Sequence, residues 1–308
     1  QEAENVQDFG ATGIGSYRSE SLFFGSSLPT RQEQCEAYKH ILNSLAPNPV
    51  TIRTLDSGGD KLVSELSLSN EANPFMGWRS IRVCLDREEL FKDQLKALLQ
   101  ANEKGNLRIL LPMISGLPEL RKSKEHIKTC LAELAEEGIE CPSVEIGIMI
   151  EVPAAVMQVE QLAKEADFFS IGTNDLIQFT LAVDRSNEMI ADMFQPHHPA
   201  ILNMIYNTVI AAHKEGIPVA VCGEMSADPF SILLLIGLGV DELSMTPWSI
   251  MEAKKIIRSI NYEDVNEIAL RTLRFDDAAS VDSFLHQRFA QAFADLGITS
   301  YVPAQKIN

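Results

Sequence analysis

Five short apolar runs in this chain are followed directly by residues that can do chemistry. Arg18, Arg53, Glu151, Asp175 and Cys222 stand at or next to these positions. A guanidinium makes paired hydrogen bonds to phosphate or carboxylate, carboxylates bind hard cations such as Mg²⁺, and a thiol can act as a nucleophile or proton donor. A single polar residue after a strand needs no function, because the chain is returning to solvent there. Together, two arginines, two acids and a thiol favour a functional site.

Two further arginines extend the set of anion-binding candidates. Arg79 follows Gly77 and Trp78 in a long segment between apolar runs, and Arg185 follows Asp184 in the loop after the fifth run. Either guanidinium could instead pair with a surface acid, and the sequence pattern leaves both interpretations open.

The two acids allow more than one chemistry. Glu151 and Asp175 could share a Mg²⁺ ion whose remaining positions are filled by phosphate oxygens and water. They could also form an acid/base pair in a glycosidase-like site, or lie solvated at the start of loops. The nearby arginines argue against a sugar and for an anionic substrate. Cys222 is either a reactive thiol or an inert core residue, and the pattern does not separate the two.

These side chains meet only if the apolar runs are neighbouring parallel strands. The runs are short and rich in Ile and Val, as is typical of strands buried on both faces: Gly13–Tyr17, Val50–Leu55, Leu107–Met113, Val144–Ile150, Phe168–Ile171, Pro218–Cys222 and Val240–Met245. Segments with a 3.6-residue apolar period follow or separate them: Glu88–Asn102, Leu117–Glu137, Pro153–Glu165, Pro199–Lys214 and Ser249–Ile260.

This alternation predicts one α/β domain over residues 1–308, a closed (β/α)8 TIM-type barrel, with an open doubly wound sheet as the alternative. In such a barrel, the carboxyl ends of all strands meet at one mouth. The long segment Ser57–Asp86 does not fit a simple crossover and is interpreted as a functional insertion after the second strand. Tyr262–Arg274 and Ala278–Leu296 predict extra C-terminal helices.

Composition excludes some classes of protein. The chain has 43 acidic and 26 basic residues, a net charge of −17, which argues against nucleic-acid binding and against an anionic membrane surface. No apolar run is long enough to span a bilayer. The five cysteines are scattered without a CxxC pair, which favours a reducing, cytoplasmic location. The chain begins at Gln1 without Met, so we expect a fragment or a processed product.

Several long motifs contain the candidate residues. They are Gly13-Ile14-Gly15-Ser16-Tyr17-Arg18-Ser19-Glu20, Arg53-Thr54-Leu55-Asp56-Ser57-Gly58-Gly59-Asp60-Lys61, Asn73-Pro74-Phe75-Met76-Gly77-Trp78-Arg79, Glu151-Val152-Pro153-Ala154, Phe169-Ser170-Ile171-Gly172-Thr173-Asn174-Asp175-Leu176, Leu181-Ala182-Val183-Asp184-Arg185 and Cys222-Gly223-Glu224. Through them the chain resembles, over roughly residues 10 to 260, the C-terminal domain of enzyme I, the phosphoenolpyruvate–protein phosphotransferase of the bacterial sugar phosphotransferase system.

The resemblance implies a role for each candidate. Arg18, Arg53 and Arg185 would bind the phosphate and carboxylate of phosphoenolpyruvate, with Arg79 assisting. Asn174 would contact the phosphate, Glu151 and Asp175 would bind Mg²⁺, and Cys222 would protonate the enol carbon to give pyruvate. The family also implies a homodimer joined through this domain. Its phosphoryl acceptor is a histidine on a separate N-terminal domain, which also docks the histidine phosphocarrier protein, and no residue here matches that motif.

The chain departs from the family at several serines. Ser16, Ser19 and Ser21 stand where Leu, Thr and Phe are usual, and Ser57 replaces an aliphatic residue. Such polar side chains are expected to weaken packing near the site. Two other hypotheses remain: the matching barrel of pyruvate, phosphate dikinase or phosphoenolpyruvate synthase, and a catalytically idle module for dimerisation or regulation.

Overall fold

A computed structural model describes residues 6–24, 27–57 and 73–298. Over these ranges, seven parallel strands form a single sheet in which each strand pairs with the next along the chain. The strands are β1 (Ile14–Arg18), β2 (Val50–Arg53), β3 (Leu107–Leu111), β4 (Glu145–Ile150), β5 (Phe168–Gly172), β6 (Val219–Cys222) and β7 (Glu242–Ser244). Each of the seven apolar runs therefore overlaps one of these strands, and β1 and β5 each extend one residue beyond their run.

The sheet curls until its two edge strands meet, which makes a nearly closed barrel. A Cβ added to Gly15 of β1 would lie 2.6 Å from the Cβ of Ser244 on β7, so the absence of a side chain at Gly15 permits this close approach. The predicted TIM-type α/β barrel is confirmed, and the open sheet is not observed. An eighth strand is not found in the described ranges, so the barrel has seven strands there rather than the expected eight.

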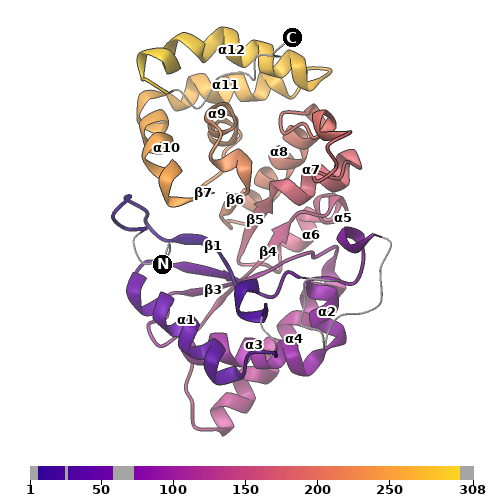
Figure 1. Ribbon diagram of the computed structural model, residues 1–308, viewed down its shortest axis with the longest axis vertical. Helices are drawn as coiled ribbons and strands as arrows, with labels where there is room; N and C mark the ends of the chain where they lie inside the picture. The colour runs from indigo at the N-terminus through magenta and orange to yellow at the C-terminus, as the bar shows by residue number, and fades with distance from the viewer. Residues whose placement is uncertain (1–5, 25–26, 58–72, 299–308) are drawn as a thin grey trace.

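Helices surround the strands, as Figure 1 shows. They are α1 (Arg31–Leu45), α2 (Ile81–Asp86), α3 (Glu88–Ala101), α4 (Leu117–Glu136), α5 (Pro153–Met157), α6 (Val159–Ala163), α7 (Thr173–Leu181), α8 (Pro199–Lys214), α9 (Pro229–Gly237), α10 (Pro247–Ser259), α11 (Tyr262–Thr272) and α12 (Ala278–Asp295). Within the described residues, no helix is both long and apolar enough to cross a membrane.

Four helices were not predicted, and one predicted helix is broken. Helix α9 is apolar nearly all round and therefore lacks the stripe that reveals a half-buried helix. The sequence pattern also did not identify α1, α2 and α7. The helix expected over Pro153–Glu165 is instead two short helices, α5 and α6, that meet at Gln158, whose side chain donates to the carbonyl of Ser115.

The insertion and the C-terminal helices flank the barrel. The described end of the insertion holds a short turn at Pro74–Met76 and then α2, whereas the Gly58-Gly59-Asp60-Lys61 motif lies outside the described residues. In Figure 1, α11 and α12 lie at the top of the molecule, and α11 packs on α9. A Cβ on Gly237 of α9 would lie 2.3 Å from the carbonyl oxygen of Val265, so the two helices touch at a glycine.

Candidate active site

Strand register brings the predicted residues to one end of the barrel. Arg18 pairs with Arg53 across β1 and β2, and Gly172 pairs with Cys222 across β5 and β6. Ile150, which pairs with Ile171, is followed directly by Glu151. Parallel strands end on the same side of a barrel, so side chains far apart in the sequence converge at its mouth.

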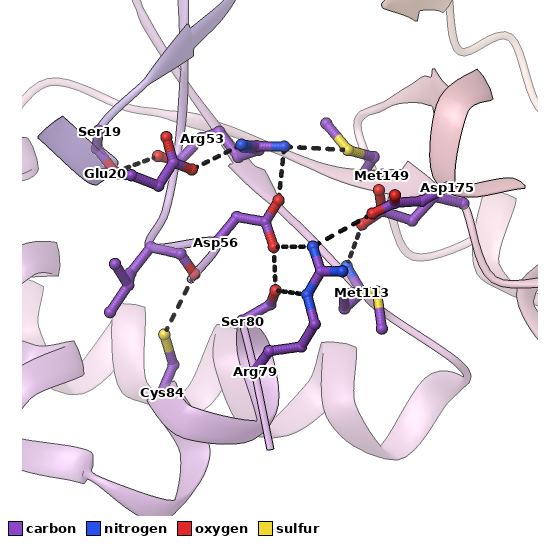
Figure 2. Close-up of polar contacts among 12 residues, drawn as sticks. Ser19, Glu20, Arg53, Asp56, Arg79, Ser80, Cys84, Met113, Met149 and Asp175 are labelled. Atoms are coloured by element: carbon purple, nitrogen blue, oxygen red, sulfur yellow. Dashed lines mark hydrogen bonds and ion pairs between the residues drawn. The ribbon is translucent and has the colours of Figure 1, made fainter. Parts of the chain in front are cut away.

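A buried network of ion pairs joins two of these arginines to three acids (Figure 2). Arg53 donates to Glu20 Oε1 at 2.7 Å and to Asp56 Oδ2 at 2.8 Å. Arg79 uses one nitrogen, Nη2, to donate to Asp56 Oδ1 at 2.9 Å and to Asp175 Oδ2 at 3.2 Å. All five side chains are at most 12% exposed, so solvent screens these contacts far less than it screens a surface pair.

Asp56 is the centre of this network because its two oxygens contact different arginines. Burial alone would raise the pKa of Asp56, but the charges of Arg53 and Arg79 outweigh burial and lower this pKa below its usual value. The carboxylate is therefore charged at neutral pH, and it fixes the spacing between the two guanidinium groups.

Ser80 holds Arg79 in place through an uncommon backbone conformation. Its φ is 56°, its backbone N–H donates to Ser57 O at 3.1 Å, and its hydroxyl donates to Asp56 Oδ1. A non-glycine residue in this region costs on the order of 1–3 kcal/mol and persists only where its surroundings fix it. Here those surroundings are the carboxylate of Asp56 and the start of α2, and Arg79 is consequently directed toward the mouth.

Glu151 is a buried carboxylate with an unusual environment. It is 2% exposed, and the backbone N–H of Met113, itself at φ 56°, donates to its Oε1 at 2.6 Å. Burial, together with the charges of Asp56 and Asp175, raises the pKa of Glu151 well above its usual range. A Cβ on Gly172 would lie 2.8 Å from Glu151 Oε2, so this carboxylate fits only beside a glycine.

The donor set at this point suits a hard cation. Glu151 and Asp175 provide carboxylates, and the charge of Asp175 is one cause of the raised pKa of Glu151, after burial and the charge of Asp56. No group of three or more possible metal ligands occurs among the described residues. Mg²⁺ is commonly held by one or two carboxylates with substrate phosphates and water supplying the rest, so two carboxylates fit this ion.

Asn174 is oriented by the chain segment after β6. The backbone N–H of Glu224 donates to Asn174 Oδ1 at 3.4 Å, so the amide oxygen is directed toward this segment. Gly223 has a φ of 125°, and a Cβ there would lie 2.4 Å from Thr173 Oγ1. This close approach brings the Cys222–Glu224 turn against the first turn of α7, whose N–H groups favour an anion.

Cys222 is a partly buried thiol with a polar neighbour. The Ser170 hydroxyl donates to its Sγ at 3.3 Å, and the thiol contacts Ile171 O at 3.7 Å. Burial raises the pKa of the Cys222 thiol, although the Ser170 hydrogen bond and the charge of Arg53 oppose this rise. The thiol is therefore protonated at neutral pH, which suits a proton donor better than a nucleophile.

Two predicted arginines remain outside the ion-pair network. Arg18 is exposed at the end of β1, where its charge still lowers the pKa of Cys222. Arg185 is exposed in the loop after α7, and no contact joins its side chain to the other candidates within the described parts of the chain. Its role therefore stays a prediction.

Sequence reasoning missed the acids that neutralise the arginines. Glu20 and Asp56 lie within the quoted motifs, and Asp56 is three residues after Arg53, a spacing that could have suggested a pair. The left-handed conformations of Ser80 and Met113 had no sequence signal. Of the unusual serines, buried Ser19 donates to Arg53 O at 2.8 Å and accepts from Gln94 at 3.0 Å, so its hydroxyl is satisfied. The buried hydroxyl of Ser57 has no hydrogen-bond partner among the described residues.

The fold and the site define an α/β-barrel protein whose mouth combines buried arginines, two candidate metal-binding carboxylates and a protonated thiol. Residues 1–262 match the family model described as the PEP-binding domain of PEP-utilising enzymes, and the chain belongs to that family. It is 46% identical over 285 residues to a phosphoenolpyruvate-protein phosphotransferase of Geobacillus stearothermophilus, covering 92% of this chain and 49% of the relative. With the Haemophilus influenzae protein of that name it is 44% identical, covering 93% and 50%.

The chain thus spans about half the length of the curated relatives it matches. Among solved structures, malate synthase of Haloferax volcanii in a pyruvate/acetyl-CoA ternary complex is similar in fold, with a TM-score of 0.52 and 16% identity over 94% of this chain and 67% of that one. Identity this low supports the barrel fold alone.

Proposed function

We propose that this chain is the phosphoenolpyruvate-binding part of a cytoplasmic phosphoenolpyruvate–protein phosphotransferase that starts sugar uptake. The observation that carries the proposal is the pair Arg53 and Arg79, which are buried at the barrel mouth and held by Asp56 between them. Buried guanidinium groups at a fixed spacing suit a small, highly charged anion. The family relationship and the relatives' names support phosphoenolpyruvate as that anion.

In the proposed reaction, Arg18, Arg53, Arg79 and Arg185 bind the phosphate and carboxylate of the substrate, and Asn174 donates its amide N–H to a phosphate oxygen. Glu151 and Asp175 hold Mg²⁺, which when bound would help to neutralise charge on the transferring phosphoryl group.

The phosphoryl group leaves the enol oxygen for a histidine nitrogen on a domain outside this chain. This leaves the enolate of pyruvate, and the Cys222 S–H then gives its proton to the enolate carbon, so that the enolate becomes pyruvate. The thiolate that remains takes a proton from water. The raised pKa of the thiol supports this order, because the proton is present when the enolate is released.

The assembly is also part of the proposal. The protein is a homodimer joined through this domain, and the histidine phosphocarrier protein binds the domain that carries the acceptor histidine. Neither nucleic acid nor a membrane is a partner, which the net charge of −17 supports.

Calorimetric titration of phosphoenolpyruvate into the protein with Mg²⁺ tests the binding step. We expect saturable, Mg²⁺-dependent heat, and Glu151→Ala should remove the Mg²⁺ dependence. Cys222→Ala should bind normally but form no pyruvate in the longer protein that carries the acceptor histidine, whereas the matched control Cys130→Ala, in α4, should form it. No binding heat would favour an idle module, and pyruvate from Cys222→Ala would exclude the thiol.

A further inference from the structure

Arg79 occupies an acid that the proposed metal site also requires. Figure 2 shows the contact from Arg79 to Asp175, in which Nη2 donates to Oδ2 at 3.2 Å. The side chains of Arg79 and Asp175 are each only 11% exposed. Asp175 is one of two carboxylates available to a cation, together with Glu151. A guanidinium hydrogen-bonded to Asp175 therefore competes with a metal ion for the same carboxylate.

We propose that Arg79 is an exchangeable partner that links metal binding to substrate binding. In the ligand-free protein Arg79 neutralises Asp175. When an anionic phosphate enters, it draws the guanidinium off Asp175, and the freed carboxylate binds the metal. This inference rests on the proposed function and assigns to Arg79 a positioning role in addition to substrate contact.

The geometry allows this exchange without a large movement of the side chain. The same Nη2 also donates to Asp56 Oδ1 at 2.9 Å, and Arg79 Nε donates to Ser80 Oγ at 3.3 Å. These two contacts hold the guanidinium while one hydrogen bond is replaced. Of the two ion pairs that Arg79 makes, the one with Asp175 is the longer. Asp175 is also the one of the two acids that is a candidate metal ligand.

The other buried arginine differs in this respect. The carboxylate partners of Arg53 are Glu20 and Asp56, neither of which is a candidate metal ligand. Its remaining described contact is to Met149 Sδ at 4.0 Å. Of the two arginines, Arg79 is therefore the one that is paired with a candidate metal ligand.

Linkage makes the consequence measurable. If a phosphate ligand favours metal binding by releasing Asp175, the metal must favour phosphate binding by the same factor. Removing the Arg79 guanidinium should tighten metal binding in the absence of substrate and should reduce the mutual enhancement. A charged hydrogen bond is worth about tenfold or more in an equilibrium constant, so we expect Mn²⁺ to bind about tenfold more tightly to such a variant.

The experiment is a calorimetric cycle with Mn²⁺ alone, phosphoenolpyruvate alone and both together. Arg79→Gln removes the charge and the hydrogen bonds of the guanidinium. Arg79→Lys retains a positive charge between Asp56 and Asp175, and it can replace the glutamine variant in the experiment if that variant unfolds. If Arg79 weakens metal binding only through its positive charge, which is the alternative to the proposed exchange, only Arg79→Gln should bind Mn²⁺ more tightly. The proposed exchange predicts that Arg79→Gln and Arg79→Lys both bind Mn²⁺ more tightly, because both lose the guanidinium that is hydrogen-bonded to Asp175.

Arg108→Gln is the matched control. Arg108 also contacts two acids, Glu145 at 2.6 Å and Glu242 at 3.1 Å, but it lies near the amino ends of β3, β4 and β7, at the opposite end of the barrel. The Arg108→Gln variant should bind Mn²⁺ within about twofold of the wild type, since the charge it removes is distant and screened.

The outcomes separate the two proposals. If the wild type binds neither Mn²⁺ nor phosphoenolpyruvate, the proposed function is wrong. If it binds both, but folded Arg79 variants bind Mn²⁺ no more tightly than the wild type, the exchange is wrong and the proposed function stands. The exchange is also wrong if Mn²⁺ affinity rises no more in the Arg79 variants than in Arg108→Gln. It is likewise wrong if the affinity rises in Arg79→Gln but not in Arg79→Lys.

Discussion

Replacing Asp56 with asparagine tests whether this carboxylate organises the mouth. The substitution keeps the size of the side chain but removes the charge that Arg53 and Arg79 share. Both guanidinium groups then remain buried with one acid each, Glu20 for Arg53 and Asp175 for Arg79. An asparagine side chain cannot serve both arginines in the same way, because its amide offers one acceptor oxygen instead of two.

The expected cost follows from burial. Removing one partner of a buried ion pair costs about 3–5 kcal/mol, because the remaining charge is uncompensated. Each arginine here keeps a second acid, so we expect the lower end, about 3 kcal/mol of unfolding free energy. A midpoint falls by roughly 2–4 °C per kcal/mol for chains of about 200 residues, so thermal unfolding should shift down by several degrees.

Urea unfolding at several pH values provides the assay, with exposed Glu125→Gln in α4 as the charge-matched control. The pKa of Asp56 is lowered in the folded protein, so its stabilisation is present above its usual pKa of 3.8 and is lost as the pH falls below that value. The difference between wild type and Asp56→Asn should therefore be full at pH 7 and shrink in acid. Inorganic phosphate should stabilise the variant more than the wild type.

Two results would refute this reasoning. If the unfolding free energies of the wild type and Asp56→Asn differ by less than about 1 kcal/mol at pH 7, the ion pairs of Asp56 contribute no more than ordinary surface pairs. A difference that persists unchanged as the pH is lowered to about 2 would mean that packing, and not the charge of Asp56, produces the effect.

Three more changes test other parts of the structure. Gly172→Ala places a Cβ 2.8 Å from Glu151 Oε2, so Mn²⁺ affinity measured by calorimetry should fall at least about tenfold as this ligand is displaced. Alkylation of Cys222 by iodoacetamide, followed by mass spectrometry, should still accelerate above pH 9 because burial raises the thiol pKa, and phosphoenolpyruvate should slow it. His197→Ala removes hydrogen bonds to Asp282 at 2.5 Å and Ser231 at 2.8 Å, so it should lower the unfolding free energy by about 1–3 kcal/mol and leave substrate affinity unchanged.

The first two of these predictions each have a comparison that isolates the cause. Gly116→Ala would meet only the movable side chain of Gln158, at 3.3 Å, and should retain Mn²⁺ affinity. Ser170→Ala should shift the alkylation of Cys222 to still higher pH, because it removes a hydrogen bond that lowers the thiol pKa. The first prediction is wrong if Gly172→Ala binds Mn²⁺ as tightly as the wild type. The second is wrong if the alkylation of Cys222 has its midpoint below pH 9, and the third is wrong if His197→Ala loses substrate binding.

The sequence by itself determined the succession of strands and most of the helices around them. Buried parallel strands must be continuous apolar runs, and amphipathic helices must show a 3.6-residue period, so both are visible in one dimension. It also indicated which residues stand at the carboxyl ends of the strands: Arg18, Arg53 and Cys222 are the last residues of β1, β2 and β6, and Glu151 directly follows β4. Helix α9 escaped detection because a helix buried nearly all round carries no such period.

Only the tertiary structure decided which charges pair. Asp56 contacts two arginines, and Arg79 shares one nitrogen between Asp56 and Asp175, 96 residues away along the chain. Which atoms lie within hydrogen-bonding distance depends on strand register, on the direction of a turn and on left-handed backbone at Ser80 and Met113. Those features arise when the whole barrel packs, because the energy that fixes them comes from contacts between distant segments and not from local preference.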